Sequence, residues 1–197
     1  AFMTEGINEH QMMLRMRGRP KILLATNYEQ AVEYYEKYKN NLLGIIIDTS
    51  YPRNGKEDPM AGVRLIEKIK RDDEFIPLLM QSSDLSNQAL ARERRAGFIH
   101  KLSHTLSIEL RNFIIQFFAF GDFVFTDPET KNEVARAADL KGLQQRIFEI
   151  PDSSLEYHVY RNHISKWLYA RALFPLAELF RDLRPGDFQD LDEIRRF

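Results

Sequence analysis

The chain contains no cysteine. This absence excludes disulfide bonds, a thiolate nucleophile and zinc sites built on thiolate ligands. It also fits a protein of a reducing compartment, and we therefore expect a cytoplasmic location.

Long apolar runs and a strong net charge are missing as well. No apolar run approaches the length needed to cross a bilayer, and the first residues do not resemble a signal peptide. The net charge of -1 gives no overall electrostatic reason to bind nucleic acid or anionic lipid. We expect neither a nucleic acid nor a membrane as a partner.

The chain has ample material for a packed core. Its 197 residues are 44% hydrophobic and 12% aromatic, which is enough for one ordinary domain and an appendage. The chain opens without an obvious initiator context. It stops at Phe197, soon after Asp190 and Glu193, which have the spacing of a capping box that opens a helix. These ends indicate a part of a longer polypeptide.

Strand and helix patterns alternate in the first part of the chain. Strands are predicted at residues 21–26, 42–48, 76–81 and 98–100, and helices at 5–17, 26–39, 62–71, 87–96 and 106–118, with a loop at 49–60. This alternation is typical of βαβ units with a parallel sheet and right-handed crossovers. We expect an α/β domain in residues 1–119.

The pattern changes after residue 119. Residues 123–135 predict a β-hairpin, and helices are predicted at 139–150, 153–163 and 164–183, the second opened by Ser153 and Glu156 and the third broken near Pro175. Residues 120–197 are therefore expected to form a hairpin and a mostly helical region.

Three polar residues follow three apolar runs. Asp48 ends the run of residues 42–47, Ser82 follows 77–81, and Lys101 follows 98–100. Open α/β folds place their sites at the carboxyl edge of the sheet, so we expect these side chains to converge there. A carboxylate nucleophile beside a cation and a hydroxyl donor suits the acceptance of a phosphoryl group.

With Pro52 and Gly62 in the following loop and Ala96 to His100 before the lysine, this series resembles the receiver domain of response regulators over residues 20–119. The resemblance implies a flavodoxin-like sheet, with Asp48 as phosphoacceptor and Ser82 and Lys101 in contact with the phosphoryl group. It also implies Phe98 as the aromatic side chain that moves on activation, and a Mg²⁺ ligand in the Ser50 carbonyl beside Asp48.

The chain departs from the family in three places. The family's first strand, which ends in two acidic residues that hold Mg²⁺, is absent before Lys21, and residues 5–17 look like the helix that follows it. The metal site would be incomplete, with weak Mg²⁺ binding at best. The loop at residues 49–61 is also long, and Leu102 replaces the proline that normally follows the lysine.

The C-terminal part has a fainter resemblance, carried by residues 121–125, Tyr157 with His158, Trp167 with Leu168, and residues 183–188. Together with the first part it resembles the N-terminal regulatory region of bacterial proteins related to phosphoenolpyruvate synthase and pyruvate phosphate dikinase. The resemblance implies catalytic domains further along the same polypeptide, whose catalytic residues are not in this chain.

Other polar residues give weaker indications. His158 and His163 are five apart, which places them on different faces of one helix and argues against a metal pair. Tyr157, Arg161 and Arg171 are candidates for a polar anchor between the two parts. No P-loop, dinucleotide fingerprint or catalytic triad is apparent. A haloacid dehalogenase would need an acid where the chain has Ser50, and an FMN-binding flavodoxin would need a phosphate loop after the first strand.

These patterns predict a regulatory module of two-component signal transduction rather than an enzyme. A histidine kinase or a small phosphodonor would supply the phosphoryl group, and domains downstream in the same polypeptide would receive the signal. The alternative is a pseudo-receiver that serves only for dimerisation or scaffolding. A homodimer is expected in either case, because residues 21–26 would form an unprotected apolar edge strand.

Overall fold

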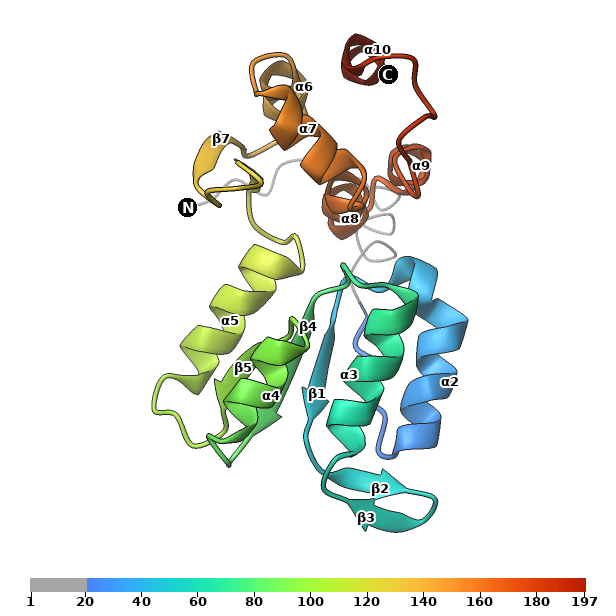
Figure 1. Ribbon diagram of the computed structural model, residues 1–197, viewed down its shortest axis with the longest axis vertical. Helices are drawn as coiled ribbons and strands as arrows, with labels where there is room; N and C mark the ends of the chain where they lie inside the picture. The colour runs from blue at the N-terminus through green and yellow to red at the C-terminus, as the bar shows by residue number, and fades with distance from the viewer. Residues whose placement is uncertain (1–20) are drawn as a thin grey trace, which may run out of the picture.

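The structure, a computed structural model, describes residues 21–197 and is a mixed α/β protein. Its central sheet has three parallel strands in the order β1-β4-β5 (Figure 1). They are β1 (Ile45–Asp48), β4 (Leu78–Ser82) and β5 (Gly97–His100). The three runs predicted as strands from residue 42 onward are therefore confirmed, although the first two begin later than expected.

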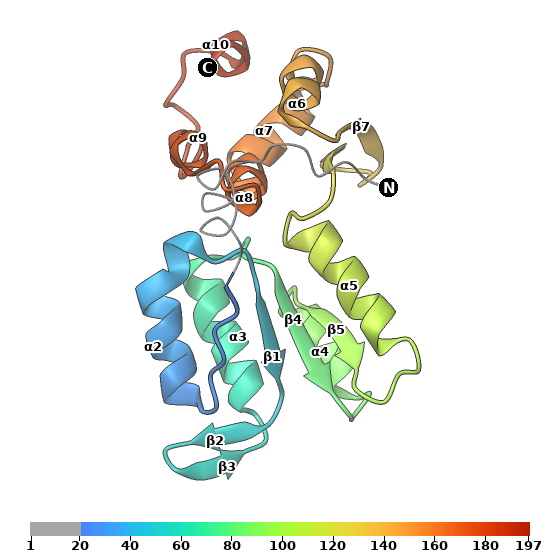
Figure 2. The same cartoon turned by 180° about the vertical axis from the view of Figure 1, so that it is seen from behind.

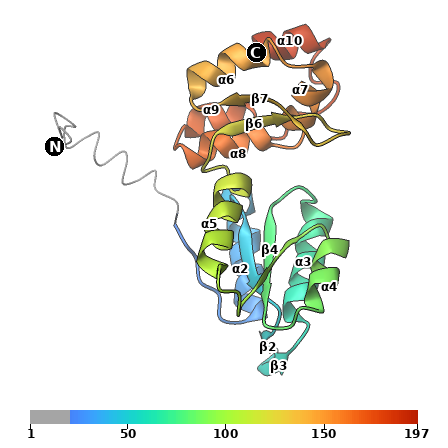
Figure 3. The same cartoon turned by 90° about the vertical axis from the view of Figure 1, so that its left-hand side faces the viewer.

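Helices flank this sheet on both faces. They are α2 (Tyr28–Tyr38), the short 3-10 helix η1 (Lys39–Asn41), α3 (Ala61–Asp72), α4 (Asn87–Glu93) and α5 (Leu106–Phe117). Figure 3 shows α3 and α4 on one side of β4 and α5 on the other. The predicted βαβ series is confirmed in this region.

An apolar cluster lies between the sheet and α3. Ile66 and Ile69 of α3 and Met80 of β4 have no exposed surface, and Leu78 is 1% exposed. The central strand β4 is flanked by strands on both sides and covered on both faces, which explains its continuous apolar run.

The prediction of a strand at residues 21–26 is wrong. These residues form no regular element, and Ile22 and Leu24 are 95% and 77% exposed. A strand requires a hydrogen-bonded neighbour, and no strand in residues 21–197 pairs with this segment. The helix predicted at residues 5–17 lies outside the described residues.

The loop predicted at residues 49–60 contains a β-hairpin. Strands β2 (Tyr51–Arg53) and β3 (Lys56–Asp58) pair antiparallel around Asn54 and Gly55, which both have positive φ angles, 52° and 73°. An Asn-Gly pair is the preferred sequence for a two-residue hairpin turn, because both positions require a left-handed backbone. This short-range signal identifies the hairpin that hydrophobic periodicity misses.

The C-terminal part begins with the predicted hairpin, β6 (Phe123–Thr126) and β7 (Glu133–Ala137). Short helices follow: α6 (Leu140–Ile147), α7 (Asp152–Val159), α8 (His163–Ala170), α9 (Phe174–Leu179) and α10 (Leu191–Arg196). Phe125 and Leu168 have no exposed surface in their shared core, and Trp167 is 1% exposed. No helix in residues 21–197 is both long and apolar enough to cross a membrane.

The helices near Pro175 and Ser153 begin differently from expectation. Pro175 lies in the first turn of α9, where its missing N–H group costs nothing, instead of kinking a long helix. Helix α7 has no side-chain cap from Ser153 and begins after Pro151. By contrast, Asp190 caps α10 as predicted, its Oδ1 accepting a hydrogen bond from the Glu193 N–H at 2.8 Å.

His158 and His163 lie side by side, contrary to the prediction of separate helix faces. Asn162 adopts a left-handed backbone (φ 59°) and separates α7 from α8, so the two residues belong to different helices. Their Nδ1 atoms are 3.0 Å apart, and the Thr126 N–H donates to His158 Nε2 at 2.9 Å. Nε2 is thus an acceptor, and a neutral His158 carries its proton on Nδ1.

The C-terminal part lies beyond the amino ends of the parallel strands (Figure 2). The Arg161 guanidinium lies over the rings of Phe75 and Tyr157, with its Cζ 4.9 Å and 4.2 Å from their centroids. Arg171 donates to the carbonyls of Ala119 and Gly121 at 3.0 and 2.7 Å. All three residues expected to form a polar anchor thus take part in contacts at or near this junction.

These buried histidines predict a pH dependence of stability. Burial lowers the pKa of His158 from 6.5 to about 4 and the pKa of His163 well below 6.5, with a further contribution from the nearby Arg161 cation. Below pH 6.5 these histidines are therefore protonated in the unfolded chain but still neutral in the folded chain. The free energy of unfolding falls as the pH falls toward 4. His158 alone would account for a loss of roughly 3 kcal/mol by pH 4.

Urea unfolding at a series of pH values tests this expectation. His158→Gln, whose amide oxygen can still accept from the Thr126 N–H, should flatten the slope between pH 6.5 and 4. His104→Gln, at an exposed position, should leave it unchanged. Equal slopes in the wild type and His158→Gln would contradict the assignment.

Candidate functional site

Asp48 and Lys101 form an ion pair at the carboxyl edge of the sheet. The Lys101 ammonium contacts Asp48 Oδ2, and the side chains are 36% and 43% exposed for lysine and aspartate respectively. A pair this exposed contributes at most about 1 kcal/mol to stability. Its interest lies in its position, because it places one cation against one carboxylate where the strands end.

The parallel register brings the three predicted side chains to one edge. Asp48 is paired with Gln81, the residue before Ser82, and Ser82 is paired with His100, the residue before Lys101. The Lys101 N–H then donates to the Ser82 carbonyl at 2.8 Å, which extends the ladder by one bond. The predicted convergence of Asp48, Ser82 and Lys101 is therefore observed.

Hydrogen bonds fix the Ser82 hydroxyl. Its oxygen accepts from the Asp84 N–H at 3.1 Å and from Asn87 Nδ2 at 2.9 Å, and the residue is 4% exposed. Both contacts use the oxygen as acceptor, so neither of them occupies the hydroxyl hydrogen. The sequence carries no signal for the Asn87 contact, because that contact depends on how α4 begins.

Close packing of α3 against β1 sets the backbone at this edge. The Gly62 N–H donates to the Thr49 carbonyl at 2.9 Å, and a Cβ atom on Gly62 would lie 2.0 Å from the Asp48 carbonyl oxygen. Thr49 is buried, and its hydroxyl donates to the Gln81 carbonyl at 3.2 Å. Only glycine permits the helix to approach the strand end this closely.

The Mg²⁺ ligands implied by the sequence are incomplete in the described residues. Ser50 lies in the turn after β1, and its hydroxyl donates to Glu57 Oε1 of the β2–β3 hairpin at 2.6 Å. Within residues 21–197, no group of three or more acidic or histidine side chains could hold a metal ion. One carboxylate and a carbonyl fall short of the oxygen ligands that Mg²⁺ requires, so these residues alone do not fit the ion.

Phe98 lies on β5, paired in register with Met80 of β4. It is half-buried against the apolar cluster between the sheet and α3. Its neighbour Ile99 is 3% exposed. The structure therefore gives Phe98 a packing role, and its predicted movement on activation stays a prediction.

The chain was compared with family models, curated proteins and solved structures, and no match was found in any of the three. The site must therefore be interpreted from its own geometry.

The contact at Gly62 gives a direct test of how the site is built. Gly62→Ala should destabilise the protein by about 1–3 kcal/mol through overpacking, although alanine is the better helix former by about 1 kcal/mol. Gly142→Ala is the matched control, because Gly142 also lies in the first turn of a helix and its added Cβ would come no closer than 3.3 Å to its neighbours.

Urea unfolding should show a clearly larger loss of stability for Gly62→Ala than for Gly142→Ala, because the Asp48 backbone cannot move aside as the Asp139 side chain can. A Gly62→Ala variant as stable as the wild type would show that α3 does not pack this closely on Asp48.

Proposed function

We propose that the chain is a regulatory module whose input is phosphorylation of Asp48. The observation that carries this proposal is the Asp48–Lys101 ion pair at the carboxyl edge of a parallel sheet, with the Ser82 hydroxyl held on the neighbouring strand. The pair is exposed enough for a phosphodonor to approach, and its cation would offset the charge of the incoming group.

In the proposed reaction, a carboxylate oxygen of Asp48 attacks the phosphorus of the donor. A bond forms between that oxygen and phosphorus, and the bond from phosphorus to the leaving group breaks, so the leaving group departs with the electron pair. Lys101 Nζ contacts Oδ2 at the start, and it can move to an oxygen of the transferred group. Ser82 can donate its hydroxyl hydrogen to a second oxygen.

The sequence resemblance supports the same proposal. A receiver of the response-regulator type, with a flavodoxin-like sheet, would use this carboxylate, hydroxyl and ammonium in this order along the chain. A histidine kinase or a small phosphodonor would be the source of the phosphoryl group. Domains downstream in a polypeptide related to phosphoenolpyruvate synthase would receive the signal through the C-terminal part.

A pseudo-receiver that acts in dimerisation is the second candidate. Two observations favour it: the described residues supply too few ligands for Mg²⁺, and apolar side chains are exposed on β1 and on α5. Ile46 of β1 is 40% exposed, and Ile108 and Phe117 of α5 are 60% and 46% exposed. Exposed apolar surface of this kind is typical of an interaction site.

Mass spectrometry after incubation with acetyl phosphate and Mg²⁺ tests the first candidate. One added phosphoryl group is expected, sensitive to hydroxylamine as an acyl phosphate should be, and absent from Asp48→Asn. Asp84→Asn is the matched control, because Asp84 lies in the adjacent loop after β4 and its amide can still accept from the Ser86 N–H.

An unmodified wild-type chain would contradict phosphorylation by this donor. A dimer in sedimentation under the same conditions would then favour the second candidate. Modification that persists in Asp48→Asn would assign the chemistry to another residue.

A further inference from the structure

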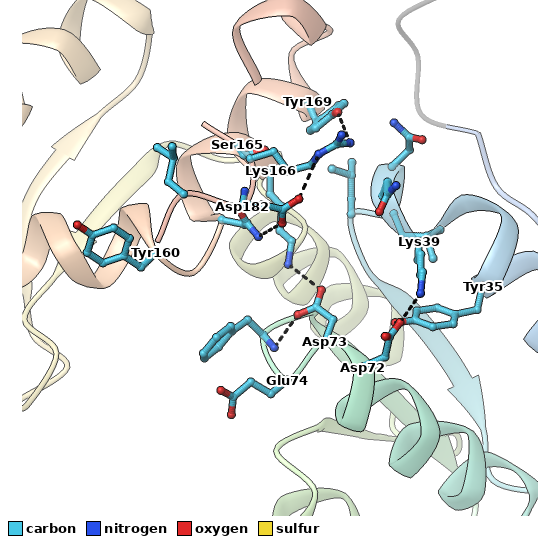
Figure 4. A pocket seen from close by; sticks show the side chains of 18 of the residues that line it. Tyr35, Lys39, Asp72, Asp73, Glu74, Tyr160, Ser165, Lys166, Tyr169 and Asp182 are labelled. Carbon is cyan, nitrogen blue, oxygen red and sulfur yellow. Dashed lines mark hydrogen bonds and ion pairs between the residues drawn. The ribbon is translucent and has the colours of Figure 1, made fainter. Parts of the chain in front are cut away.

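A polar cavity lies at the opposite end of the sheet from Asp48. It is open to solvent, has a volume of about 680 Å³ and is lined by the end of α2, the end of α3, helix α8 and the segment after α9 (Figure 4). Ligand sites typically measure about 300–1,000 Å³ and often lie between structural units, so this cavity has the size and the position of a binding site.

Positive charge exceeds negative charge in the cavity lining. Six lysine or arginine residues and four aspartate or glutamate residues contribute to it, which leaves a surplus of two positive charges. The six cationic residues are Lys39, Lys70, Arg71, Lys166, Arg181 and Arg184. This composition favours an anionic ligand over a cation.

The acidic residues of the lining are already engaged. Asp72 Oδ2 accepts from the Tyr35 hydroxyl and from Lys39 Nζ, both at 2.9 Å. Asp73 Oδ1 accepts from the backbone N–H groups of Phe75 and Ile76 at 2.9 and 3.0 Å. These carboxylates are held by contacts within the protein, and the described residues contain no group of three or more acidic or histidine side chains that could hold a metal ion.

The Lys166 ammonium has a charge partner but no hydrogen-bond partner within residues 21–197. Its Nζ atom is shielded from solvent and forms no hydrogen bond within residues 21–197. Lys166 Nζ and Asp73 Oδ2 are 3.7 Å apart, which makes an ion pair but exceeds hydrogen-bond distance. Three unused donors on an ammonium that is shielded from solvent cost free energy even when a carboxylate offsets part of the charge, and hydrogen bonds to a ligand would reduce that cost.

A second ammonium faces the same region. Lys70 Nζ donates to the carbonyls of Glu74 and Ile76 at 2.7 and 2.8 Å, which satisfy its hydrogen bonds but not its charge. Burial lowers the pKa of both lysines, the Asp73 carboxylate opposes part of that shift in each, and the positive charge of Lys166 lowers the pKa of Lys70 further. Asp73 is one carboxylate facing two ammonium groups, so a bound anion would offset the positive charge that remains.

We propose that this cavity binds a small phosphate-bearing anion, with Lys166 as its principal ligand and Lys70 as the second positive charge. Phosphate oxygens accept several hydrogen bonds at once, which matches the three donors of Lys166. The cavity exceeds the volume of orthophosphate, so a phosphorylated metabolite suits it better than the free ion. This site is separate from Asp48, and the proposal does not depend on phosphorylation there.

Isothermal titration calorimetry with inorganic pyrophosphate tests the proposal on the whole chain. Saturable binding with a dissociation constant of about 1 mM or lower is expected, weakening by about tenfold or more in Lys166→Met. Lys68→Met is the matched control, because Lys68 lies on α3 beside Lys70 but pairs with Glu36 outside the cavity lining. Its affinity should equal that of the wild type.

A nuclear magnetic resonance titration of the wild type supplies a readout that needs no variant. Amide shifts should concentrate at Asp73, Ser165 and Tyr169, which line the cavity. No binding at about 10 mM pyrophosphate, an affinity unchanged in Lys166→Met, or shifts centred on Lys101 would each overturn the proposal.

Discussion

The close approach of α3 to the end of β1 is the constraint on which both ends of the sheet depend. At its amino end, Gly62 brings the helix against the Asp48 backbone and holds the turn that follows with a hydrogen bond to Thr49. A helix of twelve residues extends about 18 Å, so the same rigid element reaches the opposite end of the sheet. There Asp72 and Asp73 contribute to the lining of the polar cavity. Both sites therefore include residues at the ends of the same helix.

This arrangement gives the chain two sites of different character. The Asp48–Lys101 pair is exposed and flanked by the β2–β3 hairpin, as suits a covalent exchange with a partner from solution. The Lys166 ammonium is shielded from solvent at the junction between the two parts, as suits a ligand that stabilises one relative position of the two parts. The Arg161 contact with Phe75 lies beside that junction and adjoins the end of α3. If both proposals hold, α3 offers a physical route for coupling between them.

The sequence predicted the sheet and its carboxyl edge well, because Asp48, Ser82 and Lys101 each follow a buried apolar run whose register is set by local pattern. Prediction from the sequence failed where the local structure depends on a segment that is distant in the chain. The apolar segment at residues 21–26 looks like a strand, but it has no pairing partner within the described chain. Asn54 and Gly55 carried a clear turn signal that a loop assignment overlooked. Lys166 could not be identified as a candidate site residue, because its environment depends on the contact of α8 with Asp73 at the end of α3.

The central claim is that Lys101 pairs with Asp48 at the carboxyl edge of the sheet. The most direct test is to follow the side-chain ammonium signals of the lysines by ¹⁵N nuclear magnetic resonance in the wild type and in Asp48→Asn. The account predicts that the Lys101 signal shifts and exchanges faster with water when the carboxylate charge is removed, while the Lys56 signal on the β2–β3 hairpin stays unchanged. A Lys101 signal that is identical in both proteins would contradict the ion pair and the site built on it.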